Sequence, residues 1–588
     1  MDLFLSHRSA RSSGAATDAA TSCRSGVMVL VCVVAMIGAC KRGLAVTVDN
    51  WNVSGGGSWN TPGNWSTGSV PTIAEDASIG SIATSVTSPA TITLDANQTA
   101  YGLTLDPGAG KFIRIIPGSS STNTLTLLST DTAPDGVNQF FTMNVASGRE
   151  NEIDAPIAIG GVSKGYTAMI NSFDPGFQIK GGISNSLAST GLKIIGNGQG
   201  IVSFYTTAST YSGDTTIAPG GILVIGLNNA LPSGTGKGNL VLEGNGQLQF
   251  YIATALTING LNSTSSASMI TNNSPNNNVM LTVGNANAGG TFAGSISNPS
   301  GTVSLMKTGS GTQKLSGANS YNGTTTISAG TLLVDGTHTG AATYSTTGSG
   351  ATLGGTGTIN LNGTNSVNLS VGSLAPGDSG PGVLNINGAL NMSSLGTLRV
   401  ELGGAFPGNG LAFYDQVNMT SPTAVINASF AHVAVSLLNG FRPRPTDVFY
   451  ILTRADSAAF GGTQPFDAFP EGATISLGSG LIGKVTYKAN WTGSQATSTV
   501  TGGNDMAIFN VVPEPTAGSL LGLGMLALLV WKVPRARRAR LQRDEDDSSG
   551  REKILATWYR MARQSELMPS SRDGSRVVRH TKKPPFWQ

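Results

Sequence analysis

Cysteine is almost absent from this chain. Only three of its 588 residues are cysteines, and all three lie within the first 40 positions. The rest of the chain can therefore form neither a disulfide nor a thiolate metal site, although small exported domains commonly rely on such cross-links. A body of several hundred residues buries a core large enough to do without them. Its stability must come from packing and from backbone hydrogen bonds.

Charged and aromatic residues are also scarce, at 11% and 6% of the chain. The charges are segregated, because residues 46–531 contain 15 basic and 23 acidic residues, a formal charge of −8, whereas both ends are basic. A nucleic-acid-binding protein needs a basic stripe with interleaved aromatic residues, and this body has none. We therefore expect no nucleic-acid partner.

Residues that carry catalysis are few. The two histidines of the body, His338 and His432, have no partner at the spacing of a catalytic motif, and no nucleophile elbow, zinc-protease helix or calcium loop is present. We interpret Asp415, Glu401 and Arg399 as solvated strand residues. We therefore predict no catalytic residue, no metal site and no cofactor, so that the chain is not an enzyme. The alternative is a β-helix polysaccharide lyase or hydrolase, which would place several Asp, Lys or Arg side chains on one strand face.

Glycine is abundant, with 79 residues, and the segments between glycines are short β-type runs. Examples are Ile222-Leu223-Val224-Ile225 and Thr331-Leu332-Leu333-Val334. No long segment with a 3.6-residue apolar period precedes residue 517. This pattern predicts an all-β chain and argues against a disordered low-complexity linker.

An internal repeat indicates the architecture. Residues 209–224 align without gaps with residues 319–334, at an offset of 110, and both copies contain Tyr, Gly, Thr-Thr-Ile, Gly and Leu-Val. Each copy reads as strand, glycine turn, strand and glycine turn, and one such unit cannot bury its apolar face alone. Stacking the units about 4.8 Å apart buries the aliphatic side chains and leaves Ser, Thr and Asn outside. We predict a right-handed parallel β-solenoid, or β-helix.

The second copy continues upstream as Leu305-Met306-Lys307-Thr308-Gly309-Ser310-Gly311-Thr312. With this extension the segment resembles the autotransporter-associated β-strand repeat, which implies an exported surface protein. The resemblance also raises the alternative of an autotransporter adhesin. Because only 73 residues follow Pro515, too few for a C-terminal membrane barrel, we expect no self-transport.

Three tryptophans, Trp51, Trp59 and Trp65, lie within 15 residues near the start of the body. This opening is similar to that of many surface proteins with the same repeat. The rings could cap the open core of the first coil, or they could form a carbohydrate-stacking platform. We expect the cap, and the three residues remain candidate carbohydrate-stacking residues.

An apolar run at residues 27–40, preceded by arginines, predicts a signal peptide with cleavage after Ala45. The alternative is a lipobox at Ile37-Gly38-Ala39-Cys40, which would make Cys40 a lipidated N-terminus. The long leader is also compatible with a misplaced start codon.

The C-terminal part begins with Val512-Pro513-Glu514-Pro515 and continues with the apolar segment Ala517–Trp531. A basic stop follows, formed by Arg535, Arg537, Arg538 and Arg540. The prolines keep the approach extended, the apolar segment predicts a single transmembrane helix, and the arginines stay on the cytoplasmic side. The arrangement resembles the PEP-CTERM sorting signal of Gram-negative bacteria. This resemblance implies recognition by an exosortase-like membrane protease and cleavage near Pro-Glu-Pro.

The apolar segment has about 15 residues, fewer than the roughly 20 of a comfortable spanning helix, and it contains glycines. It suits removal better than permanent anchoring, although a simple tail anchor is the alternative. Residues 541–588 are predicted to be a disordered basic tail, either a cytoplasmic extension or a read-through of the gene.

These features together predict six regions. They are a signal peptide at 1–45, a Trp-capped β region at 46–190, a repeat solenoid at 191–364, a C-terminal β region at 365–511, a sorting signal with its transmembrane helix at 512–540 and a disordered tail at 541–588. We expect an exported, non-enzymatic structural protein at the surface or in the extracellular matrix of a Gram-negative bacterium. It would be membrane-anchored before processing and associated with exopolysaccharide or cell-surface glycans. A carbohydrate-binding adhesin is a further alternative.

Overall fold

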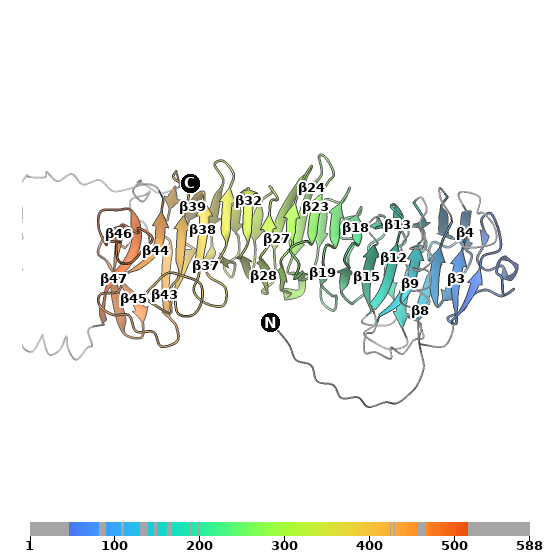
Figure 1. Cartoon of the computed structure of the whole chain (residues 1–588), viewed down its shortest axis with the longest axis horizontal. Coiled ribbons are helices and arrows are strands. Elements are labelled where there is room, and N and C mark those ends of the chain that lie inside the picture. Colours follow the sequence, from blue (N-terminus) through green and yellow to red (C-terminus); the bar gives the residue numbers. More distant parts are fainter. Residues whose placement is uncertain are drawn as a thin grey trace, which may run out of the picture. The chain divides into compact units, whose positions relative to one another are not determined.

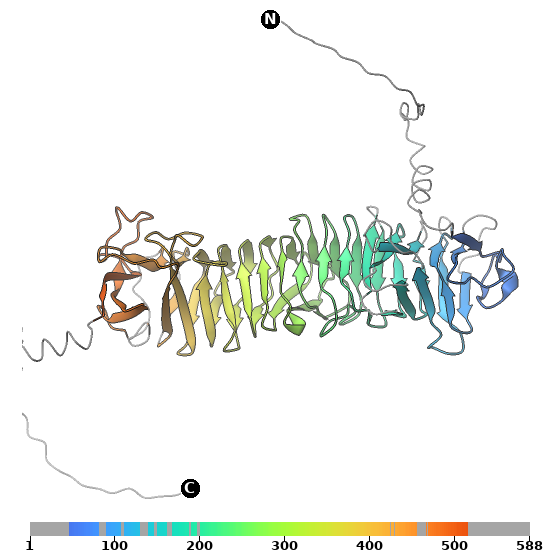
Figure 2. The same cartoon turned by 90° about the horizontal axis from the view of Figure 1, so that it is seen from below.

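The computed structural model of this chain describes residues 46–514, except for 81–89, 108–110, 130–138, 146–149, 162–166, 187–189, 197–199, 424, 429, 456–465 and 467–468. Within these residues the chain forms β-strands and two short 3-10 helices, η1 (Pro62–Asn64) and η2 (Asn285–Asn287). The strands stack into parallel sheets that together form a β-solenoid (Figures 1 and 2). The predicted all-β parallel solenoid is confirmed, and its right-handedness stays a prediction.

The solenoid has three faces, each built from two sheets. The first face has a nine-stranded and a seven-stranded sheet, with the strands β1 (Thr47–Asn50), β3 (Glu75–Ile79), β6 (Gly102–Leu105), β9 (Gln139–Val145), β12 (Thr167–Ser172), β15 (Gly191–Gly196), β17 (Thr215–Ile217), β19 (Leu240–Leu242) and β22 (Leu261–Asn262), then β25 (Gly290–Phe292), β28 (Thr312–Leu315), β31 (Thr331–Val334), β34 (Thr352–Gly355), β37 (Gly372–Pro376), β40 (Gly396–Leu402) and β43 (His432–Leu437).

The second face has a ten-stranded and a nine-stranded sheet. Its strands are β2 (Gly57–Ser58), β4 (Ala90–Leu94), β7 (Ile113–Pro117), β10 (Glu152–Ile153), β13 (Phe177–Ile179), β16 (Ile201–Phe204), β18 (Ile222–Ile225), β20 (Gln247–Phe250), β23 (Met269–Asn272) and β26 (Ser295–Ser297), then β29 (Ala318–Asn319), β32 (Thr337–Ala341), β35 (Thr358–Leu361), β38 (Val383–Asn387), β41 (Gln416–Met419), β44 (Phe449–Arg454), β47 (Asp505–Pro513), β46 (Leu481–Ala489) and β45 (Thr474–Gly478).

The third face has a four-stranded and an eight-stranded sheet. Its strands are β5 (Gln98–Ala100), β8 (Leu125–Ser129), β11 (Ile157–Gly161) and β14 (Ile183–Asn185), then β21 (Ala255–Thr257), β24 (Asn278–Val283), β27 (Thr302–Lys307), β30 (Thr325–Ile327), β33 (Tyr344–Thr346), β36 (Ser366–Leu369), β39 (Ala389–Met392) and β42 (Ile426–Asn427).

Inward-facing residues form continuous aliphatic rows. Because successive residues of a strand point to opposite sides of a sheet, parallel stacking in register places one inward residue directly beside the next. One row on the first face consists of Leu103, Met143, Ile170, Ile194, Ile217 and Leu242, paired in this order. All six side chains are buried, and burying each one stabilises the fold by about 2 kcal/mol. The row belongs to one hydrophobic cluster that extends from Trp51 to Val511.

Outward-facing rows carry polar amides, as the sequence predicts. Asn368, Asn391 and Asn427 occupy successive strands of the third face. The Nδ2 of Asn391 donates to the Oδ1 of Asn368 at 2.9 Å, and the Nδ2 of Asn427 donates to the Oδ1 of Asn391 at 2.8 Å. On the second face, Asn418 donates in the same way to Asn385 at 2.8 Å. Such rows tie neighbouring coils together from the outside without using charge.

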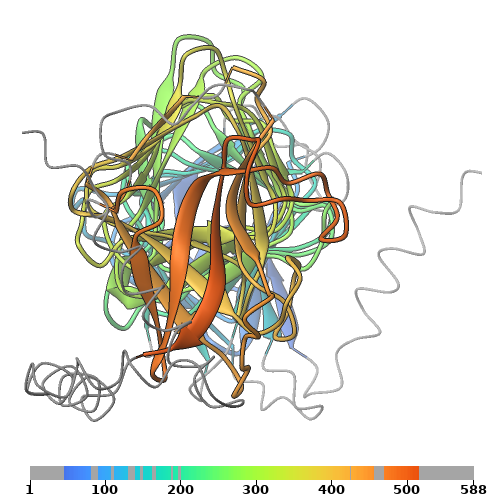
Figure 3. The ribbon, with the colours of Figure 1, turned by 90° about the vertical axis from the view of Figure 1, so that its left-hand side faces the viewer.

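The solenoid ends in a change of strand direction. Strand β47 pairs antiparallel with both β44 and β46, and β45 pairs antiparallel with β46. These strands lie across the C-terminal end of the coils in Figure 3. The antiparallel sheet thereby covers the last parallel edge, which would otherwise offer unpaired backbone groups to another chain.

The three predicted β regions are parts of one solenoid, because the sheets continue across residues 190 and 364. Among the described residues, no helix has the length and apolar character needed to span a membrane. The segment expected to span it, Ala517–Trp531, lies outside the described residues, as do the signal peptide (1–45) and the predicted tail (541–588).

Candidate functional site: a polar groove on the first face

The predicted sorting motif begins inside the last strand of the solenoid. Val512 and Pro513 are the final residues of β47 and lie opposite Ile482 and Leu481 of β46. Glu514 follows the strand and is exposed. The described part of the motif is therefore continuous with the C-terminal sheet, without an intervening linker. Outside the described residues lie Pro515, Arg535, Arg537, Arg538, Arg540 and Ala45.

The three tryptophans form a buried cluster at the first coil. The ring of Trp65 lies edge-on to both others, with its centroid 5.0 Å from that of Trp51 and 4.8 Å from that of Trp59. Its Nε1 donates to the backbone oxygen of Trp59 at 2.8 Å. The residues are 5%, 0% and 1% exposed in chain order. Because a ring needs an open face to stack on a sugar, this burial favours the cap over a carbohydrate-stacking platform.

Asp415 is buried, and its interpretation as a solvated strand residue is wrong. Its carboxylate accepts the backbone N–H groups of Gly382 and Glu401, both at 2.7 Å. Burial raises the pKa of Asp415 to about 8, against the effect of these two donors. No local sequence pattern indicates this burial, because Gly382 is 33 residues away in the chain. The solvated interpretation holds for Arg399, which is exposed on β40.

Both copies of the internal repeat build the same corner. In each copy a buried tyrosine shares a hydrogen bond with the hydroxyl of the threonine four residues later, Tyr211 with Thr215 at 2.6 Å and Tyr321 with Thr325 at 2.8 Å. The two copies nevertheless lie on different faces, because Thr215 starts β17 on the first face and Thr325 starts β30 on the third. The repeat therefore specifies a strand–corner–strand unit that fits at more than one edge of the solenoid.

Lys307, the lysine of the second copy, takes an inward position next to Ile327 in the stack of the third face. It is fully buried. Its Nζ donates to the backbone oxygens of Thr308 at 2.6 Å, Gly309 at 2.8 Å and Ala329 at 3.2 Å, which uses all three ammonium protons. Burial lowers the pKa of Lys307 to about 8, so that the ammonium stays charged at neutral pH. Lys307 therefore closes a corner and faces no substrate.

The tyrosine of the second copy also contacts a buried histidine. The Nε2 of His338 donates to the backbone oxygen of Tyr321 at 2.7 Å, and its Nδ1 accepts the hydroxyl of Tyr344 at 2.5 Å. Burial lowers the pKa of His338 to about 4. The imidazole is therefore neutral at physiological pH, and both ring nitrogens are occupied within the core. This geometry fits a structural histidine and not a general acid or base.

An open groove of about 510 Å³ lies on the outer side of the first face. It coincides with the place where the two sheets of this face meet, because β22 and β25 are joined by an isolated bridge between Ser263 and Phe292 and not by a continuous ladder. The buried side chain of Gln313 takes the place of the missing strand partner of Leu261. Its Oε1 accepts the N–H of Leu261 at 3.1 Å, and its Nε2 donates to the oxygen of Leu261 at 2.9 Å. One side-chain amide thus stands in for a peptide group.

The floor of the groove is an outward row of the first face. Strands β19, β22, β25, β28 and β31 contribute Val241, Asn262, Thr291, Lys314 and Leu333 in this order. Thr264 and Thr312 add two more hydroxyl groups to the lining. The three threonines are exposed, and in the part of the chain that the structure describes their hydroxyls have no hydrogen-bond partner. The groove therefore presents hydroxyls and an amide above two aliphatic side chains.

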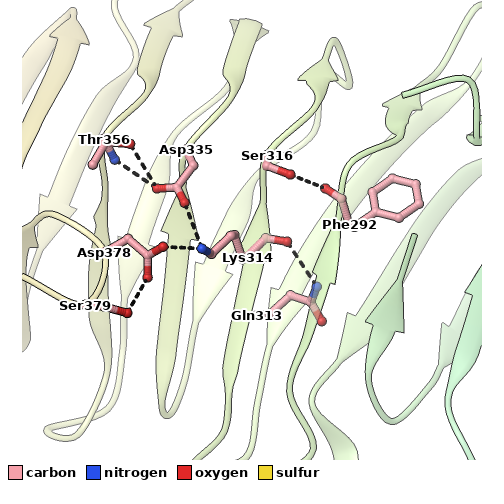
Figure 4. Close-up of polar contacts among 8 residues, drawn as sticks. All are labelled: Phe292, Gln313, Lys314, Ser316, Asp335, Thr356, Asp378 and Ser379. Carbon is pink, nitrogen blue, oxygen red and sulfur yellow. Dashed lines mark hydrogen bonds and ion pairs between the residues drawn. The ribbon is translucent and has the colours of Figure 1, made fainter. Parts of the chain in front are cut away.

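Ion pairs lie toward both ends of the groove. At the β19 end, Glu243 pairs with Lys193 at 2.9 Å. At the β28 end, Lys314 lies between two carboxylates, with its Nζ 3.3 Å from Asp335 and in contact with Asp378 (Figure 4). The hydrogen bond that Lys314 donates to the carboxylate of Asp378 is the main cause that raises the pKa of Lys314. Three carboxylates and two ammonium groups leave one negative charge in excess.

This arrangement suits binding better than catalysis. A glycosidase needs a carboxylic acid and a carboxylate that both face the substrate, whereas Glu243, Asp335 and Asp378 are each paired with a lysine. Among the described residues, no cluster of His, Cys, Asp or Glu could hold a metal ion. The groove therefore offers hydrogen-bonding groups to a ligand and no reactive pair of side chains.

Comparison with known proteins identifies the repeat. The Passenger-associated-transport-repeat family matches residues 197–225 and 305–334. Both predicted copies fall within these segments, so the resemblance to the autotransporter-associated repeat is confirmed for this part of the chain. The repeat is typical of exported β-helix proteins associated with autotransporters and indicates an exported or surface protein. No curated protein matches the chain.

Sequence reasoning missed the groove. Its lining comes from strands of five successive coils, and each strand contributes only one or two residues. Two lining residues lie in segments that the sequence singled out, Thr312 in the run upstream of the second repeat copy and Leu333 in the copy itself, but neither segment indicated a groove. One signal was available, since the repeat pattern is interrupted between residues 225 and 305, which is where the two sheets of the first face meet.

Proposed function

We propose that this chain is an exported, non-enzymatic structural protein of the cell surface or extracellular matrix, associated with exopolysaccharide or cell-surface glycans. The observation that carries the proposal is the continuous parallel solenoid with outer rows of hydrogen-bonded Asn side chains, closed at its end by an antiparallel sheet. Such a stack is stiff, and its hydroxyl and amide groups match the hydrogen-bonding groups of polysaccharides.

The proposal includes sorting by an exosortase-like membrane protease in a Gram-negative bacterium, with the chain held in the membrane until it is cut near Pro513-Glu514-Pro515. The position of the motif supports this part. Because β47 ends at Pro513, a cut after this residue leaves every described strand in place.

An enzymatic role, as a polysaccharide lyase or hydrolase, is the second candidate. The paired state of the groove carboxylates and the structural roles of Asp415 and His338 weigh against it. Incubation of the purified protein with neutral and acidic polysaccharides separates the two. The structural proposal expects the protein to sediment with a polysaccharide and to generate neither unsaturated ends nor new reducing ends. Release of either product refutes it.

A further inference from the structure

We infer that the groove between β19 and β31 binds one strand of a linear, neutral polysaccharide that runs along the solenoid axis. The inference rests on the proposed association with glycans and goes beyond it by naming the site and the class of sugar. The direction of the groove, its exposed hydroxyl groups and its charge support this assignment.

The direction follows from the strand register. The floor residues Val241, Asn262, Thr291 and Lys314 belong to successive coils, so that they follow the axis at intervals of about 4.8 Å. The monosaccharide repeat of an extended, β-linked glycan is of similar length. A linear chain in the groove therefore meets an equivalent position of the protein at each successive sugar.

The hydrogen-bonding groups follow from the sequence of this face. The hydroxyls of Thr264, Thr291 and Thr312 are exposed and unpartnered within the described residues. The hydroxyl groups of a sugar can donate to them and accept from them. The half-buried Val241 supplies some aliphatic surface for the C–H face of a ring, whereas Leu333 is only 8% exposed. The lining has no aromatic residue, so we expect weak binding, with a Kd of about 1 mM for a short oligosaccharide.

The charge of the groove selects the class of glycan. Both lysines near it are already paired, Lys193 with Glu243 and Lys314 with Asp335 and Asp378. Among the described residues near the groove, a polyuronate meets no unpaired lysine and one excess negative charge, which disfavours its approach. A neutral glycan meets no such penalty.

The test compares a neutral glucan, hydroxyethyl cellulose, with a polyuronate, alginate, in affinity gel electrophoresis of the full chain. We expect retardation by hydroxyethyl cellulose and none by alginate. The variant Thr264→Ala/Thr291→Ala/Thr312→Ala removes the three hydroxyls and should weaken binding by about 150-fold, since each of the three lost hydrogen bonds is worth about 1 kcal/mol. The matched control, Thr282→Ala/Thr326→Ala/Thr358→Ala, changes three outward strand threonines on the other two faces, none of which lines the groove. It should bind as the wild type does.

Three outcomes would overturn the inference. If the triple groove variant keeps wild-type affinity while the wild type binds hydroxyethyl cellulose, the site is wrong but the proposed glycan association stands. If the wild type binds only alginate, the class of glycan is wrong. If it binds neither polymer, the groove and the proposed glycan association both fail. Thermal unfolding of both variants should match the wild type, because all six positions are on the surface. A second variant, Glu243→Gln, removes one carboxylate from the groove, leaves Lys193 without its partner and should increase binding to alginate.

Discussion

Acid should destabilise the coil that contains the second repeat copy, and His338 should be the cause. The ordinary pKa of histidine is 6.5, and burial lowers the pKa of His338 in the folded protein to about 4. The unfolded chain therefore takes up a proton between pH 6.5 and 4 that the folded chain excludes. The contribution of His338 to stability is fully present above pH 6.5 and is lost as the pH falls through 4.

The magnitude follows from the shift. One pKa unit corresponds to 1.36 kcal/mol, so the loss relative to pH 7.5 is about 1 kcal/mol at pH 5.5 and about 3 kcal/mol at pH 4. The tyrosines that contact His338 do not titrate in this range, since burial raises the pKa of Tyr321 to about 12 and that of Tyr344 well above its ordinary value. The acid step in this cluster should therefore be due to the imidazole.

The assay is native-state hydrogen exchange, read by mass spectrometry on peptides that cover β29 to β33, at pH 7.5, 5.5 and 4. Local exchange is suitable because a stacked solenoid need not unfold in one step. In His338→Gln the side chain keeps a donor and an acceptor but cannot be protonated, so its opening free energy should change less with pH. The matched control is His432→Gln, which makes the same change at an exposed histidine on β43. Equal pH dependence in His338→Gln and wild type would refute the reasoning.

Three further predictions concern the core and the C-terminal end. Gln313→Leu removes both hydrogen bonds to Leu261 and should lower the free energy of unfolding, measured by chemical denaturation, by about 3 kcal/mol. The control Gln249→Leu, on the outer side of β20, should change this free energy by less than about 0.5 kcal/mol. Lys307→Met leaves three backbone oxygens without their donor and should lower the free energy of unfolding by about 3 kcal/mol. The control Lys488→Met, at an exposed lysine, should change this free energy little. A chain that ends at Glu514 keeps β47 and should have a melting temperature within about 2 °C of that of the full chain. A chain that ends at Asn504 lacks β47, which exposes the edge of β44, and it should aggregate. Equal stability of either core variant and its control, or equal behaviour of the two truncated chains, would contradict the corresponding role.

The fold was largely predictable from the sequence, because its determinants are local. The run Thr325-Thr326-Ile327, followed by a glycine turn and Thr331–Val334, specifies two strands and the corner between them wherever it occurs. Two copies at an offset of 110 were enough to predict stacking. The sequence could not show that the copies lie on different faces, because the offset does not reveal how many residues each intervening coil contains.

The groove and the role of Asp415 were not predictable, because both depend on distant pairings. The partner of Gln313 lies 52 residues earlier, at Leu261, and that of Asp415 lies 33 residues earlier, at Gly382. No local pattern distinguishes such an amide or carboxylate from a solvated one. Lys307 illustrates the same limit, since a lysine inside an otherwise aliphatic row looks like a surface residue until its three backbone acceptors are known.

The central claim is that an exported solenoid is delivered outside the cell and released at its C-terminal motif. Mass spectrometry of the mature protein, isolated separately from the secreted and the membrane fractions, tests it most directly. The account predicts an N-terminus just after Ala45 and, in the secreted fraction, a C-terminus within a few residues of Pro513-Glu514-Pro515. A secreted protein whose C-terminus is intact at Gln588 would contradict it.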